Sequence, residues 1–227
     1  MSQGVLKTQT KLSRKERERL SHRHLILSTA EKLFSTKGYY GTTISDIASA
    51  AEFAVGTIYQ HFSSKDELYN SVLEEKVEDF IEGAERAVAQ AKSPLEKIEN
   101  IINFHLSYAV QNESFIRIYL IEKEAKFNSA HARMWKDFTD GYIRYLEIVS
   151  EVIRGGINNG IFKKVDPLRA ALALTGIVLN FISYWLSGEG DAKGLPNEKE
   201  FILNMFLNGI ERGNLKKKER HLRVDET

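Results

Sequence analysis

The stretch "TTISDIASAAEFAVGTIYQHFSSKDEL", from Thr42 to Leu68, contains two short apolar patterns separated by a tight break. Each pattern is about two helical turns long, which is too short to be stable without packing against another element. Two short helices joined by a tight turn form the helix-turn-helix unit, whose second helix lies in a DNA major groove. The stretch therefore predicts a DNA-binding unit with helices near 43–50 and 54–61.

The side chains of this stretch divide into two faces. One face is apolar and is expected to pack on Leu27, Ala30, Leu33 and Phe34 of a preceding helix; its members are Ile44, Ile47, Ala48, Ala51, Phe53, Ile58 and Phe62. The other face is expected to point outward and consists of Thr42, Thr43, Ser45, Ala54, Val55, Thr57, Tyr59, Gln60, His61 and Lys65. Hydroxyl, amide, imidazole and ammonium groups can donate to phosphate oxygens and base edges. The outward set favours DNA contact over an ordinary solvated surface.

Charge is concentrated at both ends of a chain whose formal net charge is only +1. Residues 1–30 hold seven Lys or Arg residues against two Glu residues, a local charge of +5, and a second basic run lies at 216–223. A basic arm suits a polyanion, although a charged terminus is also typical of a solvated tail. We retain both interpretations for the first run and favour a tail for the second.

The rest of the chain has helical periodicity, so we predict an all-α fold of about nine helices. The expected helices are 13–37, 43–50, 54–61, 64–91, 94–111, 113–125, 128–159, 167–187 and 197–213. The first three are short, and the later ones are longer and more apolar. This shift predicts a DNA-binding domain over 1–63 and a larger helical domain for ligand binding and dimerisation over 64–227.

Helix ends are marked by capping residues. Four pairs place a side-chain oxygen three residues before a carboxylate, the spacing of a capping box: Ser13 and Glu16, Ser64 and Glu67, Ser93 and Glu96, Asn197 and Glu200. Pro94 and Pro167 are each expected at the first position of a helix. Glycines are expected to end helices at Gly38, Gly160, Gly188 and Gly213.

The longer stretch "GYYGTTISDIASAAEFAVGTIYQHFSSKDELYNSVL" resembles the N-terminal domain of the TetR family of transcriptional repressors. The similarity consists of a glycine-aromatic helix end, a Thr-Thr-x-x-x-Ile-Ala helix, a Gly-Thr-Ile-Tyr-x-x-Phe helix and a Lys-x-x-Leu that opens the fourth helix. It covers about residues 20–72. The later segments "GGINNGIF" and "VDPLRAALALTGIVLNF" match the family's ligand and dimer domain more loosely.

The resemblance implies roles for individual residues. Thr43 and Lys65 would contact phosphates, Gly56 would allow close approach of the backbone to DNA, and the basic arm would reach along the duplex. Contacts from the third helix would come from Thr57, Tyr59 and His61. Beside what the resemblance implies, Gln60 lies on the same outward face, and Ala54 and Val55 offer apolar contacts. The implied partners are a double-stranded operator, a small-molecule inducer and a second copy of the chain. Repression and activation are both compatible with this layout.

Two residues depart from the family pattern. Glu52 stands in the turn where glycine is usual, so it either adopts a left-handed conformation, at about 1–2 kcal/mol, or the turn differs. Ala54 stands where Ser or Thr usually caps the third helix, which removes about 0.5–2 kcal/mol of capping. Both departures bear on the angle of the third helix.

The segment from Ala170 to Gly188 contains no charged residue, which is long enough to suggest a membrane span. Polar residues interrupt it, and a helix without a wet face can also be buried in protein. We predict that it forms a four-helix dimer interface with the helix at 198–212 and its copies, with ordinary monomer core as the alternative. No membrane contact is expected.

An aromatic-rich set, which includes several residues with polar tips, lies between the helix-turn-helix unit and the end of the 167–187 helix. Spacings of three, four and seven are typical of core, and His105 alone is better explained as a core or surface histidine. As a group, these residues suit a small-molecule pocket with apolar walls. The candidate ligand residues are Phe104, Tyr108, Phe115, Tyr119, Trp135, Phe138, Tyr142, Asn180 and Tyr184.

Other functional classes are disfavoured. The chain lacks the P-loop, zinc-protease and nucleophile-elbow motifs, so we expect no enzyme and no catalytic residues. It has no cysteine, and no metal site or cofactor is expected. The absence of cysteines and of a signal-peptide pattern favours the cytoplasm. The alternative function is an architectural or partner-binding helical protein that uses its basic ends without operator specificity.

Overall fold

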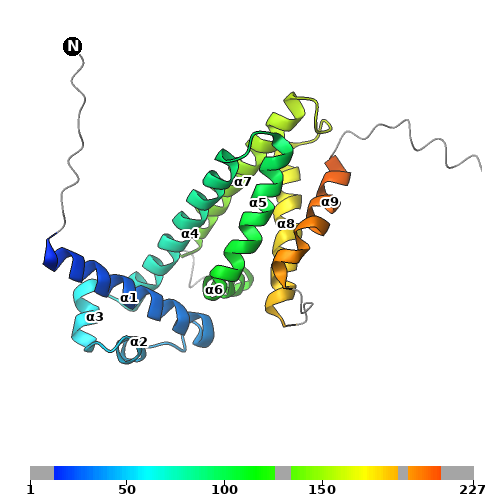
Figure 1. Ribbon diagram of the computed structural model, residues 1–227. Coiled ribbons are helices and arrows are strands. Elements are labelled where there is room, and N and C mark those ends of the chain that lie inside the picture. The colour runs from blue at the N-terminus through cyan, green and yellow to red at the C-terminus, as the bar shows by residue number, and fades with distance from the viewer. Residues whose placement is uncertain (1–12, 126–133, 189–193, 211–227) are drawn as a thin grey trace, which may run out of the picture. The chain divides into compact units, whose positions relative to one another are not determined.

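The computed structural model describes residues 13–125, 134–188 and 194–210, without the side chains of 122–125 and 134–138 (Figure 1). Helices make up the regular structure of these residues, as the periodicity predicts. The chain divides into two compact units, Met1–Val72 and Leu73–Thr227. The division falls inside a helix, C-terminal to the expected domain boundary at Ser63.

The first unit contains α1 (Arg14–Lys37), α2 (Ile44–Ala50), α3 (Val55–His61) and the start of α4 (Lys65–Ala89). Helix α2 packs on both α1 and α3. The short helices are held by a shared core, in which one fully buried residue of α3, Ile58, joins Phe34, Phe62 and Tyr69. The rings of Phe34 and Tyr69 meet edge to face with centroids 4.7 Å apart. This packing supplies the stability that two-turn helices lack.

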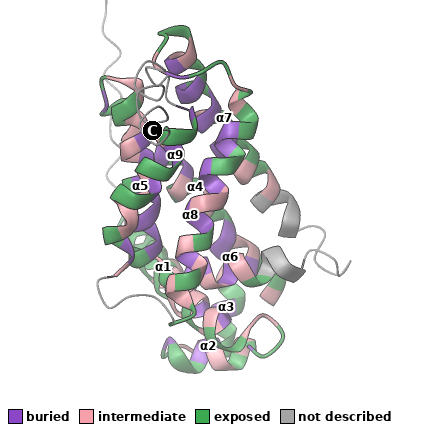
Figure 2. Ribbon diagram, turned by 90° about the vertical axis from the view of Figure 1, so that its right-hand side faces the viewer, coloured by how far each residue is buried: buried purple, intermediate pink, exposed green. Residues whose placement is uncertain are grey.

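The second unit contains the remainder of α4 and five further α-helices. These are α5 (Pro94–Gln111), α6 (Glu113–Ala125), α7 (Met134–Asn158), α8 (Pro167–Leu186) and α9 (Lys199–Ile210), with a short 3₁₀ helix, η2 (Leu195–Glu198), before α9. Helix α5 contacts α7, α8 and α9, and α7 packs along α8. Buried residues line the faces where these helices meet (Figure 2). Parts of two expected helices, 128–133 and 211–213, lie outside the described residues.

The predicted caps are partly confirmed. Ser13 and Glu16 form a complete capping box. Ser64 and Ser93 each accept from the expected backbone amide, but the carboxylates of Glu67 and Glu96 accept from the amides of Ser63 and Lys92, one residue before the expected donor. The Asn197 box is wrong, because Asn197 lies inside η2. Pro94 and Pro167 lie in the first helical turn as predicted, and Asp166 caps α8.

Candidate nucleic-acid interface and ligand cavity

Helix α3 presents one small polar face. Ile58 is fully buried, while Val55, Gly56, Tyr59 and Gln60 are exposed. Thr57 and His61 are half-buried beside them. A Cβ added at Gly56 would have no neighbour within 4 Å, so a surface could approach the backbone closely there. The expected inward position of Ile58 and the expected outward positions of Val55, Tyr59 and Gln60 are confirmed. Tyr59, at 53% exposure, is the largest exposed side chain of α3.

The turn before α3 is strained, because a non-glycine residue adopts a left-handed backbone conformation there. Glu52 adopts a φ of 58°, the left-handed conformation. The amide of Phe53 donates to the carbonyl of Ala48 over 2.9 Å and that of Glu52 to Ser49 over 3.3 Å, which is a Schellman ending for α2. Glycine would adopt this φ without penalty, so Glu52 carries the expected strain.

The start of α3 has no side-chain cap. Ala54 occupies the N-cap position, and no side chain there accepts a hydrogen bond from the helix. By contrast, Thr43 and Asp46 form a complete capping box at the start of α2, which the sequence reading missed. Thr43 remains exposed at that position.

Two residues expected on the outer face have structural roles. Thr42 is fully buried, and its hydroxyl donates to the carbonyl of Gly38 over 2.8 Å, so its expected outward position is wrong. Lys65 is half-buried, and its Nζ donates to the carbonyls of Tyr39 (3.0 Å) and Thr42 (3.1 Å) and lies 4.1 Å from the centroid of the Tyr39 ring. The Lys65 bonds join residues more than twenty positions apart, which periodicity does not reveal. One donor of the ammonium group remains beyond these two bonds.

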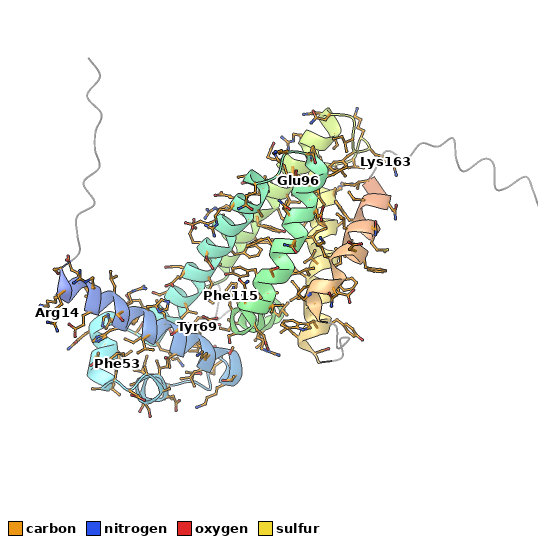
Figure 3. All side chains as sticks on the ribbon, in the orientation of Figure 1. Arg14, Phe53, Tyr69, Glu96, Phe115 and Lys163 are labelled. Atoms are coloured by element: carbon orange, nitrogen blue, oxygen red, sulfur yellow. The ribbon has the colours of Figure 1, made fainter. Side chains whose placement is uncertain are left out.

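The N-terminal half of α1 is basic and lies beside the end of α3. Its residues 14–23 include five Lys or Arg against two Glu, and residues 13–21 are exposed; Arg14 marks its start in Figure 3. The rings of His22 and His61 lie 6.4 Å apart, and the Arg23 guanidinium lies over Phe62. Partial burial lowers the pKa of His61, and the positive charges of Arg19, His22 and Arg23 lower it further. The described part of the basic arm is thus a helix, not an extended tail.

The second unit contains a partly open apolar cavity of about 60 Å³, room for about four water-sized groups. Five helices line it: α4 with Val77, Phe80 and Ile81; α5 with His105; α6 with Phe115, Ile116 and Tyr119; α7 with Gly141, Tyr142 and Tyr145; α8 with Thr175 and Leu179. None of these residues carries a formal charge when the histidine is neutral. Phe115, which Figure 3 labels, contributes from α6.

Three candidate ligand residues line this cavity, namely Phe115, Tyr119 and Tyr142. Phe104 and Tyr108 instead line a polar groove between α4 and α5, where the Tyr108 hydroxyl donates to the carbonyl of Lys76 over 3.0 Å. Asn180 and Tyr184 are exposed on α8 and do not line the cavity. Trp135 and Phe138 have side chains outside the described residues.

The cavity wall contains a buried hydrogen-bonded pair. The hydroxyl of Tyr145 lies 3.2 Å from Nδ1 of His105, and both side chains are buried. Burial lowers the pKa of His105 to about 4 and raises the pKa of Tyr145, because desolvation disfavours both charged forms. Burial and the neighbouring Tyr142 raise the pKa of Tyr119 to about 12. At neutral pH the whole wall is uncharged.

The sequence reading missed Phe80, which organises the wall. Its ring lies 5.1–5.3 Å from the rings of Phe104, His105, Tyr108 and Tyr145. Gly141 admits Val77, since a Cβ there would lie 2.3 Å from a Val77 methyl. The apolar spacing of Val77, Phe80 and Ile81 on one helix face was the available signal.

Helices α8 and α9 expose large apolar side chains. These are Leu168, Leu172 and Tyr184 on α8, and Phe201 (54% exposed) and Met205 (57%) on α9. The two helices pack on each other. By length and composition α8 alone among the described helices could cross a membrane, but one such helix is weak evidence because core helices of soluble proteins pass the same test. Within the described ranges no cluster of three or more His, Asp or Glu could hold a metal.

Known proteins resemble both units. Residues 26–72 match "Bacterial regulatory proteins, tetR family", and residues 91–210 match "Tetracyclin repressor-like, C-terminal domain". The chain is 24% identical over 188 residues to the fatty acid metabolism regulator protein of Bacillus subtilis (strain 168), covering 82% of this chain and 93% of that one. It is 27% identical over 164 residues to the HTH-type transcriptional regulator HbdR of Aromatoleum sp. (strain CIB), covering 72% of this chain and 68% of that one.

Solved structures show the same fold. The regulator FadR from Bacillus subtilis in complex with stearoyl-CoA superimposes with a TM-score of 0.70 at 23% identity, covering 83% of this chain and 99% of that chain. KstR2, a ketosteroid transcriptional regulator of Mycobacterium tuberculosis, superimposes with a TM-score of 0.70 at 21% identity. The superposition covers 84% of this chain and 95% of that chain. The proteins that resemble this chain are transcriptional regulators, not enzymes.

Proposed function

Because the chain belongs to the TetR family of bacterial transcriptional regulators, we propose that it is a dimeric repressor whose operator is released by a small lipophilic ligand. DNA binding and ligand response are properties of regulators of this family. To these family properties the proposal adds that the operator is palindromic, that particular residues contact it and that the protein binds it as a homodimer. It also places the protein in the cytoplasm, where the operator DNA is.

The exposed face of α3 carries the DNA-binding part of the proposal. Tyr59, Gln60, Thr57 and His61 offer phenol, amide, hydroxyl and imidazole groups to phosphates and base edges. Ala54 and Val55 offer apolar contacts such as those made with thymine methyl groups, and Gly56 admits the backbone. Thr43 contacts phosphate from the start of α2. Lys65 holds the turn before α2 and offers its remaining donor to a phosphate.

The apolar face of α8 and α9 supports the homodimer. A set of large apolar side chains on two adjacent helices is unfavourable in water and marks an interaction surface. A second copy of the same face would cover it with four helices. Two copies would present two α3 helices to two half-sites of a palindrome, as dimeric helix-turn-helix proteins do.

The apolar cavity supports ligand control. Its tyrosines and aromatic walls suit a lipophilic molecule. FadR from Bacillus subtilis is known in complex with stearoyl-CoA, which shows that this fold can hold a lipophilic ligand. A ligand that prefers the conformation unable to bind DNA would lower operator affinity by its differential binding free energy, typically about 1–3 kcal/mol.

Selection of bound duplexes from a random pool with the full chain tests the DNA-binding proposal. We expect one palindromic sequence to be enriched and to compete over random DNA in a mobility-shift titration. Affinity should fall steeply with salt, because phosphate contacts release counterions. Enrichment of no sequence, with equal binding to all duplexes, would instead favour the architectural alternative.

A charge placed on the proposed interface tests the dimer. Met205→Asp introduces a carboxylate at an exposed apolar position of α9, so we expect a monomer in sedimentation and weaker binding to the full palindrome. Ile143→Asp, at an exposed apolar position of α7, is the matched control and should remain dimeric. A wild-type protein that sediments as a monomer at micromolar concentration would contradict this part.

A further inference from the structure

The buried pair of His105 and Tyr145 gives the cavity a hydrogen-bond site that its apolar walls lack. The two residues come from different helices, α5 and α7, and both line the cavity. The bond from Tyr145 to Nδ1 is the only one that the His105 ring makes with the described residues. The second ring nitrogen, Nε2, is therefore available to another molecule.

The pair always has one polar hydrogen left over. If the Tyr145 hydroxyl donates to Nδ1, the single proton of the neutral ring is on Nε2. If Nδ1 carries the ring proton and donates to Tyr145, the phenol hydrogen is free. In either arrangement one N–H or O–H is not used inside the pair. A buried donor without an acceptor is unfavourable, so the pair favours a partner that brings an acceptor.

The cavity is also unsuited to ions. None of its lining residues is Asp, Glu, Lys or Arg, so an ionised group would lose its water without gaining a counter-charge. The phenols and the imidazole remain neutral for the same reason, as their shifted pKa values indicate. An acceptor without charge fits these walls, and a carboxylate does not.

We propose that this cavity binds the uncharged, acceptor-bearing part of an apolar ligand, a carbonyl of a ketone, ester or thioester, through the His105–Tyr145 pair. The inference rests on the proposed function, because it names the chemistry of the inducer site. The cavity holds about 60 Å³, which fits a carbonyl and a few carbons. A longer ligand must displace side chains or leave its remainder outside the cavity.

Three probes of equal chain length test the inference on the full-length protein without DNA. 2-Octanone carries a neutral acceptor, octanoate an anion and octylammonium a cation, and their dissociation constants can be measured by calorimetry. We expect 2-octanone to bind at least about tenfold more tightly than either ion. Equal binding of octanoate, or no binding of 2-octanone at millimolar concentration, would overturn the proposal.

Variants identify the residues that read the carbonyl. Tyr145→Phe keeps the ring and should weaken 2-octanone binding about three- to tenfold. His105→Gln should also weaken 2-octanone binding, while octanoate binding stays weak because the walls remain uncharged. Tyr40→Phe, an exposed tyrosine of the first unit, is the matched control and should change nothing. Unchanged binding by a folded Tyr145→Phe protein, with loss in Tyr142→Phe instead, would assign the carbonyl to Tyr142 and reject the pair. If His105→Gln does not fold, Tyr145→Phe alone decides.

Operator binding is measured separately, so the two proposals can fail independently. A protein that binds its operator but discriminates no probe keeps the DNA-binding function and loses the cavity chemistry. A protein that prefers 2-octanone but keeps its operator in the presence of the ketone retains the cavity chemistry and loses the proposed induction.

Discussion

Each unit of this protein uses a histidine and a tyrosine, but in opposite environments. Tyr59 is exposed on α3, and His61 is half-buried beside it. His105 and Tyr145 lie in the core of the second unit, where they hydrogen-bond each other and keep one polar hydrogen. The comparison shows that burial, not residue type, decides whether such side chains meet water or must first pair with each other.

Removing the two tyrosines should separate these roles most clearly. Tyr145→Ala leaves a void and an unpartnered His105, so we expect a loss of about 3–5 kcal/mol in the free energy of unfolding. Tyr59→Ala should change it by no more than about 0.5 kcal/mol, because that ring is exposed. Denaturant titrations of both variants measure the difference. Equal losses would contradict the comparison.

The buried histidine should also make the stability depend on pH. Burial lowers the pKa of His105 to about 4, below the ordinary value of 6.5, so between these values the unfolded chain binds a proton that the folded chain excludes. Stability from this group is complete above about pH 6.5 and falls toward pH 4, by up to about 3 kcal/mol.

The variant His105→Gln should lose this part of the pH dependence. We expect the unfolding free energies of wild type and variant to converge as the pH falls from 6.5 to 4. His24→Gln, at an exposed position of α1, is the control and should follow the wild type. Parallel curves for wild type and His105→Gln would show that the histidine is not held neutral by the fold.

For the exposed Tyr59, the expected effect is a loss of affinity for the operator. Tyr59→Ala should weaken binding to the selected operator by about 1–3 kcal/mol, or roughly five- to 150-fold, because it removes a contact to a base or phosphate. Mobility-shift titration measures it, and Ile143→Ala in the second unit serves as the control. Unchanged affinity would remove Tyr59 from the interface.

The smallest expected effect concerns the turn before α3. Glu52→Gly should stabilise the protein by about 1 kcal/mol, because glycine adopts a φ of 58° without the penalty of a side chain. Thermal unfolding measures this gain. Glu31→Gly, in the middle of α1, should instead destabilise the protein by about 1 kcal/mol.

The first unit could be predicted in detail because its signals are local. Periodicity placed Ile58 inside and Tyr59 outside, and the strain at Glu52 and the missing cap at Ala54 followed from residue type and position. Contacts between distant residues could not be predicted in this way. The bonds that occupy Lys65 depend on how the segment after α1 meets the start of α4.

The cavity was harder to predict because helix rotation depends on tertiary packing. Phe115, Tyr119 and Tyr142 were identified as members of an aromatic-rich set, but Asn180 and Tyr184 were not separated from the inner face of α8. A helix that is apolar all round has no period that marks its inner side. Phe80 was missed because an ordinary core phenylalanine has the same spacing.

The contacts of Lys65 have a mechanical consequence. One ammonium group at the first turn of α4 binds the carbonyls of Tyr39 and Thr42, in the segment that leads to the cap of α2 at Thr43. If α4 turns about its own axis, its first turn draws this segment with it, and α2 is displaced without any hinge between them. Lys65→Met would keep the aliphatic stem but uncouple the two movements.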